Sequence, residues 1–139
     1  MLQCRDPSEH RLEELEQIIR QTAVECAATF NADAEVALLL NTRPAAMDPH
    51  LADLIRRGAE EVAAPHVTMP SGAGHDAMVL ARHLPAAMLF VPSIGGRSHH
   101  VSEDTKEEDI VLGARVFFRA VELLLLEQKR AGGADSFTH

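Results

Sequence analysis

Stretches of apolar residues at helical spacing, separated by short apolar runs, most constrain the fold of this 139-residue chain. The first two stretches begin after Asp6-Pro7 and Asp48-Pro49, each a cap residue followed by a proline that suits a first helical turn. A shorter helix is predicted within residues 74–84. The last helix is predicted from a Thr105/Glu108 capping box to Gly132-Gly133. Each helix has an apolar face that must pack against another element.

The short apolar runs between the helices are typical of buried strands. The clearest are residues 34–40 (AEVALLL) and 86–91 (AAMLFV), and weaker ones are residues 66–69 and 1–5. Strands that alternate with helices predict an α/β fold in which helices cover sheets. The single break in this pattern, at residues 42–48, marks the domain boundary.

Charge and composition exclude several partners. The formal net charge is −8, and no Lys/Arg cluster is longer than Arg56-Arg57, which argues against nucleic acid as the main partner. No apolar run reaches the roughly 18 residues that span a bilayer, and the N-terminus lacks a signal-peptide pattern. We therefore predict a cytoplasmic protein with no membrane partner. The isolated Cys4 and Cys26 fit reduced thiols.

A glycine-rich loop, residues 70–77 (PSGAGHDA), precedes the third helix. Its glycines let the backbone approach a ligand closely, and the following helix N-terminus offers free N–H groups to an anion. His75 and Asp76 lie at this helix start. From these local features alone, a ligand loop and a plain glycine turn capped by an acidic residue remain equal alternatives.

The loop at residues 95–105 (GGRSHHVSEDT) carries adjacent histidines after a predicted buried strand. Adjacent side chains point in different directions, so one of His99 and His100 could bind a metal or substrate while the other faces water. Glu103 lies nearby. A solvated histidine pair is the alternative, because a metal site needs several convergent ligands.

Three segments in this order and spacing resemble a known family. They are residues 4–15 (CRDPSEHRLEEL), residues 69–96 (MPSGAGHDAMVLARHLPAAMLFVPSIGG) and residues 97–105 (RSHHVSEDT). They are similar to the C-terminal part of the hydantoinase/carbamoylase family of dinuclear-metal amidohydrolases. That family includes hydrolases of N-carbamoyl-L-amino acids, allantoate and β-ureidopropionate. The resemblance covers nearly the whole chain.

The resemblance implies roles for individual residues. His99 would be a ligand of the metal pair, whereas His100 falls at a variable position. Glu103 would hydrogen-bond the loop so that the His99 imidazole points at the metal. Asp76 would contact the binding residues rather than the ligand itself. Arg5 would clamp the substrate carboxylate with its two-pronged guanidinium group. The residues that would face the bound acid group are Gly72, Ala73, Gly74 and His75.

The resemblance also implies the domain organisation. Residues 1–43 would be the β-α-β end of a lid and dimerisation domain, and residues 44–139 the C-terminal α/β segment of the catalytic domain. Arg97 departs from the family, where many members have an apolar residue, and would alter substrate preference.

The other metal ligands and the general base of the family lie upstream of the lid, so no catalytic residue is assigned within this chain. The complete enzyme would use divalent metal of the zinc or manganese type, with none bound tightly by this chain alone. We expect a fragment of an amidohydrolase that cleaves linear C–N bonds of N-carbamoyl amino acids or related amides, inactive alone. Its partners would be a second copy of itself and a separate or missing N-terminal half. The alternative is a non-catalytic assembly or binding module.

Overall fold

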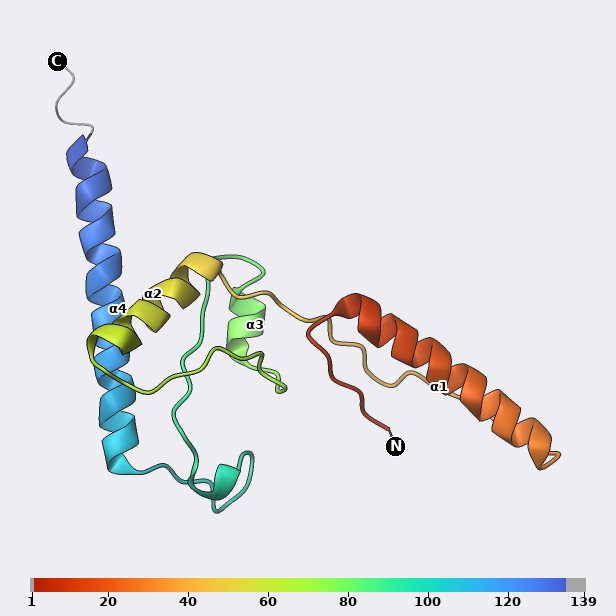
Figure 1. The fold of residues 1–139 in the computed structure, drawn as a ribbon. Helices are drawn as coiled ribbons and strands as arrows, with labels where there is room; N and C mark the ends of the chain where they lie inside the picture. The colour runs from red at the N-terminus through yellow and green to blue at the C-terminus, as the bar shows by residue number, and fades with distance from the viewer. Residues whose placement is uncertain (1, 135–139) are drawn as a thin grey trace.

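A computed structural model describes residues 2–134, which form four α-helices and one 3₁₀ turn (Figure 1). In chain order the elements are α1 (Glu9–Thr29), α2 (Pro49–Glu61), α3 (Asp76–Leu80), η1 (Ile94–Gly96) and α4 (Glu107–Ala134). Figure 1 shows α1 reaching away from the group formed by α2, α3 and α4, joined to it along the chain by the irregular segment between α1 and α2. Among the described helices, only α2 and α4 pack against each other.

The start of α1 differs from the prediction. Ser8, not Asp6, is the N-cap, and its side chain accepts a hydrogen bond from the Arg11 backbone N–H. Asp6 lies two residues earlier, and its carboxylate accepts from the Ser8 N–H at 2.8 Å. Both residues are good cap residues, so local preference alone could not decide between them. The helix exposes apolar side chains such as Ile18 and Val24.

The core lies between α2 and α4. Leu54, the most deeply buried large side chain, packs with Ala120 and Leu123. About one helical turn further along the same interface, Val116 of α4 packs with Ala59 of α2. A Cβ added at Gly58 would lie 2.9 Å from the Val116 carbonyl oxygen, so glycine allows the two backbones to approach closely.

Two ion pairs beside this core join α2 to α4. Arg57 contacts Glu127 at 2.8 Å, and Arg119 contacts Glu61 at 2.5 Å. Hydrogen bonding to Glu127 raises the pKa of Arg57 above its usual range. Within α2, the hydrogen bond from Arg56 lowers the pKa of Asp53 below its usual value.

Two other helix limits also differ from the prediction. The third helix is only five residues long, and turns follow it where residues 81–84 were predicted to be helical. The last helix begins at Glu107, and no side-chain cap bond from Thr105 is found within residues 2–134. It extends to Ala134, past the predicted end at Gly132-Gly133. The helical bonds of a long helix outweigh the modest cost of glycine near its end.

The predicted strands do not form among residues 2–134, so the β-α-β unit and the α/β architecture are not seen in the described chain. Residues 34–40, 66–69 and 86–91, and the described part of residues 1–5, are irregular. A strand is stable only when a neighbour about 4.8 Å away pairs its N–H and C=O groups. No such pairing is formed by these runs within residues 2–134, and Leu39 and Leu40 are 77% and 79% exposed.

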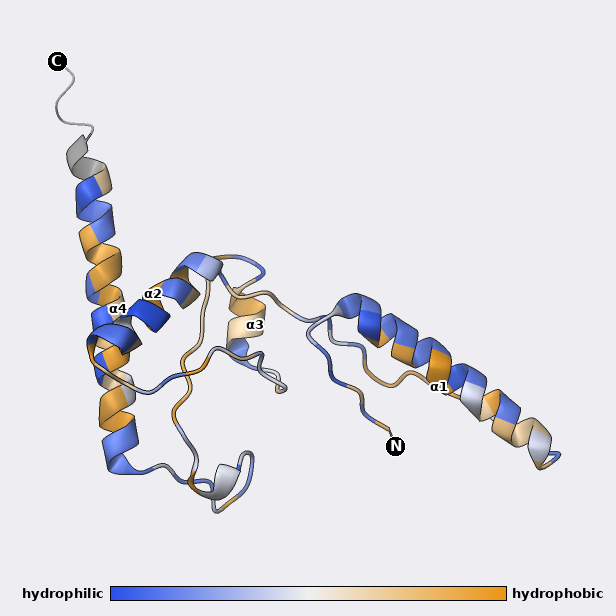
Figure 2. Cartoon of the chain, viewed as in Figure 1, coloured by the Kyte–Doolittle hydropathy of each residue, from blue (hydrophilic) through white to orange (hydrophobic). Residues whose placement is uncertain are grey.

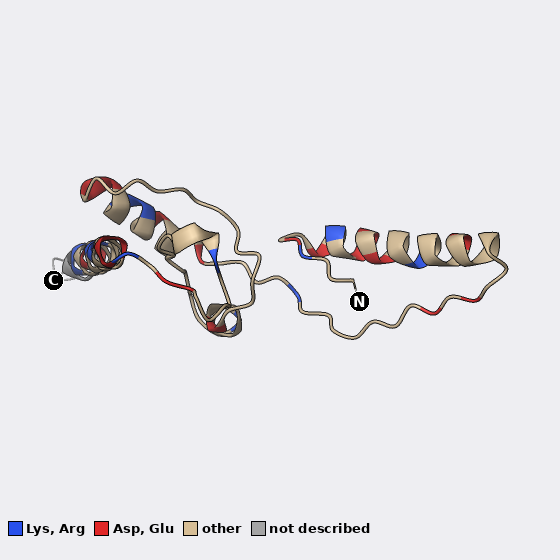
Figure 3. Cartoon of the chain, turned by 90° about the horizontal axis from the view of Figure 1, so that it is seen from below, with Lys and Arg blue, Asp and Glu red and all other residues tan. Residues whose placement is uncertain are grey.

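The molecule has a large surface for its size. Its accessible area is 11329 Å² at 15.2 kDa, whereas a compact monomer of this mass exposes about 7,100 Å². Figure 2 shows apolar residues along α4 and on α1, including faces that no other described element covers. In the view of Figure 3, Lys and Arg are scattered rather than gathered on one face. No helix within residues 2–134 is long and apolar enough to cross a membrane.

Candidate functional site

Arg5 reaches from the N-terminal segment to the glycine-rich loop. Its Nη1 donates a hydrogen bond of 2.5 Å to the Gly72 carbonyl oxygen, across 67 positions in sequence. Its Nη2 donates to the Gln3 side chain at 3.3 Å. No atom would lie within 4 Å of a Cβ added at Gly72, so the space beside this backbone is open. The structure thus brings together two residues that were predicted to bind substrate.

A serine–histidine pair shapes the glycine-rich loop. Ser71 Oγ lies 3.0 Å from His75 Nε2 and accepts a hydrogen bond from the Ala73 N–H at 3.2 Å. The His75 ring also packs on Phe90, with 5.2 Å between ring centroids and a tilt of 57°. His75 is the N-cap residue of α3, and Asp76 is the first residue of that helix. The loop is therefore held between α3 and the segment that contains Phe90.

The second loop is closed by its own hydrogen bonds. The Ile94 N–H donates to the Asp104 carbonyl oxygen at 2.8 Å, which joins the two ends of the loop. Gly95 and Gly96 have φ of 69° and 65°, a left-handed conformation that favours glycine. Arg97 Nη1 donates to Ser102 Oγ at 2.5 Å.

His99 and Glu103 are in contact within this loop. The His99 backbone N–H donates to Glu103 Oε2 at 2.7 Å, and His99 has φ of 56°. A non-glycine residue in this region carries a modest backbone strain, which the carboxylate contact helps to hold. His100 instead contacts Ser102 Oγ through Nδ1 at 2.8 Å. Glu103 therefore accepts a hydrogen bond from the loop backbone, and the predicted metal role of His99 stays a prediction.

The described residues do not form a metal site by themselves. No group of three His, Cys, Asp or Glu side chains within residues 2–134 is close enough to hold an ion. Structural zinc needs four ligands and catalytic zinc about three from the protein. No hydrogen bond between described residues links the His99 loop to the Arg5–Gly72 contact. The structure therefore assembles two separate parts of the predicted site.

With this geometry established, comparison with known proteins defines the class of protein. Residues 8–123 match the model of peptidase family M20/M25/M40. The chain belongs to this family, and its relatives include N-carbamoyl-L-amino-acid and allantoate amidohydrolases. Members of this amidohydrolase class are generally metal-dependent.

Individual relatives show how similar the chain is and how much of each protein it matches. The chain is 34% identical over 123 residues to an N-carbamoyl-L-amino-acid amidohydrolase of Paenarthrobacter aurescens, matching 88% of this chain and 30% of that protein. It is 32% identical over 117 residues to the enzyme of that name from Rhizobium meliloti, matching 84% and 28%. An amidase of the hydantoinase/carbamoylase family from Burkholderia multivorans has a TM-score of 0.80 at 34% identity, covering 83% of this chain and 28% of that one. The predicted resemblance is confirmed. The chain spans less than a third of the length of these relatives.

Sequence reasoning missed the contacts of Ser71 and Phe90. A serine four residues before a histidine, across a glycine loop, is a signal that could have suggested the Ser71–His75 bond. The position of Phe90 against His75 carried no sequence signal, because the two residues approach only through the fold.

Proposed function

We propose that this chain supplies the end of an amidohydrolase site that holds the substrate carboxylate, in an enzyme that hydrolyses the linear C–N bond of N-carbamoyl amino acids or related amides. The hydrogen bond from Arg5 to the Gly72 carbonyl carries this proposal, because it joins the proposed clamp to the proposed substrate loop. The similarity to N-carbamoyl-L-amino-acid amidohydrolases supports the substrate class.

The chemistry of the pair fits an acid group. A guanidinium group can donate two parallel hydrogen bonds to one carboxylate, and such charge-assisted bonds are stronger than neutral ones. Gly72 has no side chain, and the space beside it is open to a ligand. A bound carboxylate would take over the Nη1 hydrogen bond that the Gly72 oxygen now accepts. The backbone of Ala73, Gly74 and His75 would face the bound carboxylate, and Asp76 would contact this backbone from the side away from the ligand.

The metal part of the proposal is limited to one ligand in this chain. We place His99 at the metal pair and Glu103 as the residue that fixes its loop. The described residues contain no group of three metal-binding side chains, so the other ligands would come from outside them. The metal would be of the zinc or manganese type.

The same proposal assigns residues 1–43 to a lid and dimerisation domain and residues 44–139 to the catalytic domain of a cytoplasmic homo-oligomer. The separate position of α1, joined to the remaining helices by one irregular connector, supports a boundary near residue 43 (Figure 1).

A two-part experiment tests this function. The chain is titrated with an N-carbamoyl-L-amino acid and with its decarboxylated analogue, and the Gly72 amide is followed by NMR. Ammonia release is then measured with zinc or manganese, for the chain alone and after addition of the N-terminal two-thirds of a relative. We expect binding that requires the carboxylate, and hydrolysis only in the complemented mixture. Equal binding of both compounds would refute the clamp.

The alternative function is a non-catalytic assembly or binding module. The absence of a three-ligand cluster within residues 2–134 and the exposed apolar faces of α1 and α4 favour it. Complex formation with the N-terminal part and no hydrolysis under any metal condition would support this alternative.

A further inference from the structure

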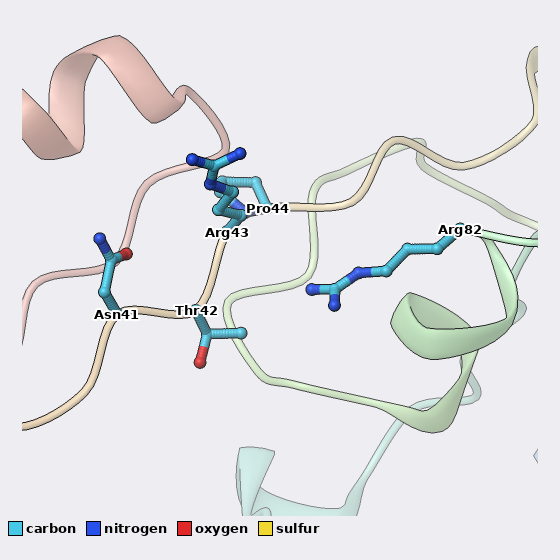
Figure 4. Close-up of a pocket in the computed structure, with 5 residues that line it drawn as sticks. All are labelled: Asn41, Thr42, Arg43, Pro44 and Arg82. Carbon is cyan, nitrogen blue, oxygen red and sulfur yellow. The ribbon is translucent and has the colours of Figure 1, made fainter.

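A polar pocket has no lining residue in common with the Arg5–Gly72 contact or the His99 loop. It has a volume of about 620 Å³ and is lined by Asn41, Thr42, Arg43, Pro44 and Arg82 (Figure 4). Residues 41–44 belong to the connector between α1 and α2, whereas Arg82 follows α3. The pocket therefore joins segments that are almost forty positions apart in sequence. Its volume lies within the range of small-molecule sites.

The free hydrogen-bond donors at this pocket belong to Arg82. Figure 4 shows Arg82 extended toward the connector, with the Thr42 methyl group turned toward it and the Asn41 and Arg43 side chains turned away. The Arg82 guanidinium has no hydrogen-bond or ion-pair partner within residues 2–134. A guanidinium group carries five N–H donors and no acceptor. An arginine with its full set of donors free favours an oxygen-rich ligand.

The charge at the pocket has the same sign throughout. None of the five lining residues is acidic, although the whole chain has a net charge of −8. Arg43 turns its Nε to Glu9 at 2.9 Å, so its position is held by an ion pair at the start of α1. It remains close enough to line the pocket. The charge of Arg43 is therefore balanced by Glu9, and the Arg82 guanidinium is the group that would attract an anion and repel a cation.

We propose that this pocket binds a small oxyanion, a phosphate or a carboxylate, with Arg82 as its ligand. The planar guanidinium group matches either anion with two parallel hydrogen bonds. A bound anion would link the connector at residues 41–44 to the segment after α3. The site shares no residue with the proposed substrate clamp, so its success or failure is independent of the proposed function.

NMR titration of the full chain tests this site. Inorganic phosphate and succinate are added in separate titrations at constant ionic strength, which removes simple screening effects. Saturable shifts are expected at the Thr42 backbone amide and the Arg82 Nε–H. The anion that binds more tightly identifies the ligand chemistry. Shifts that rise linearly without saturation for both anions would overturn the proposal.

Matched variants separate the site from general charge. Arg82→Gln should weaken binding by at least about tenfold, because a charged hydrogen bond is lost. Arg82→Lys, which keeps the charge but loses the two-pronged geometry, should give a smaller loss. Arg115→Gln removes an exposed arginine on α4 outside the pocket and should bind as the parent chain does. Equal weakening by Arg82→Gln and Arg115→Gln would show that only the net charge matters.

Discussion

Arg5 is exposed and is held by a backbone carbonyl rather than by a carboxylate. Its free energy of interaction with a substrate therefore depends on how well an acid group replaces the Gly72 oxygen. His99 is held in a different way, through its backbone N–H and the Glu103 carboxylate. At the scale of single residues, the two proposed roles can be tested separately.

Arg5→Lys should weaken binding of an N-carbamoyl-L-amino acid. Lysine keeps the positive charge but loses the paired hydrogen bonds, so a loss of about 1.5–3 kcal/mol is expected. Calorimetry on the chain measures this loss directly, and in a complemented enzyme it should appear chiefly in KM. Arg11→Lys, an exposed change on α1, is the matched control. An equal loss for the decarboxylated analogue would contradict the assignment of Arg5.

The chain alone should bind zinc weakly. A stable site needs about three or four convergent ligands, and the described residues contain no such group. Calorimetry at neutral pH should show no stoichiometric binding with a Kd below about 1 µM. If submicromolar binding is found, and His99→Ala abolishes it while His100→Ala does not, further ligands must have been missed.

At the scale of helices, the contact between α2 and α4 is the only helix–helix packing within residues 2–134. It combines a small apolar core around Leu54 with ion pairs at its edges. Gly58 sets the distance between the two helices, because any Cβ there meets the Val116 carbonyl. The stability of the described chain should therefore respond strongly to changes along this one interface.

Gly58→Ala should destabilise the chain, although alanine is the better helix former. The added methyl group meets backbone atoms of α4, and such overpacking costs about 1–3 kcal/mol, which exceeds the gain in helix propensity. Urea denaturation followed by circular dichroism measures the change. Gly72→Ala is the control, because no atom lies within 4 Å of a Cβ added there. A loss for Gly72→Ala as large as that for Gly58→Ala would contradict this view of the interface.

Acid should weaken α2 through Asp53. Hydrogen bonding to Arg56 places the pKa of Asp53 below its unfolded value in the folded chain, and that unfolded value is about 3.9. The contribution is therefore complete above this pH and is lost as the pH falls through the lower, folded value. Thermal melts between pH 6 and pH 2 should show a smaller acid-dependent loss for Asp53→Asn than for the parent. Identical pH profiles would show that the pair contributes nothing.

At the scale of the whole molecule, the exposed surface is the main feature. The area of 11329 Å² exceeds that of a compact monomer, and Phe117 and Phe118 on α4 are 59% and 65% exposed. Apolar surface of this extent is typical of an interaction site. We propose that a second copy covers part of it, with α1 and residues 34–40 as the main contacts.

Sedimentation tests this self-association. The chain should form dimers or larger species at micromolar concentration, because association removes apolar surface from water. Ile18→Glu and Leu39→Glu together should shift the equilibrium toward monomer, whereas Glu14→Gln on α1 should not. A single monomeric species across the micromolar range would exclude the proposed contact.

The sequence by itself determined the helices, the family and the residue types of the site. Helical bonds join residues four positions apart, so spacing and caps such as Asp48 carry the information locally. The tertiary structure alone decided that Arg5 meets Gly72, that His75 packs on Phe90, and that Arg82 faces the connector. It also decided that residues 34–40 and 86–91 remain unpaired within the described chain. Strand pairing and these contacts join residues far apart in sequence, and a local apolar pattern does not specify which partner will lie beside it.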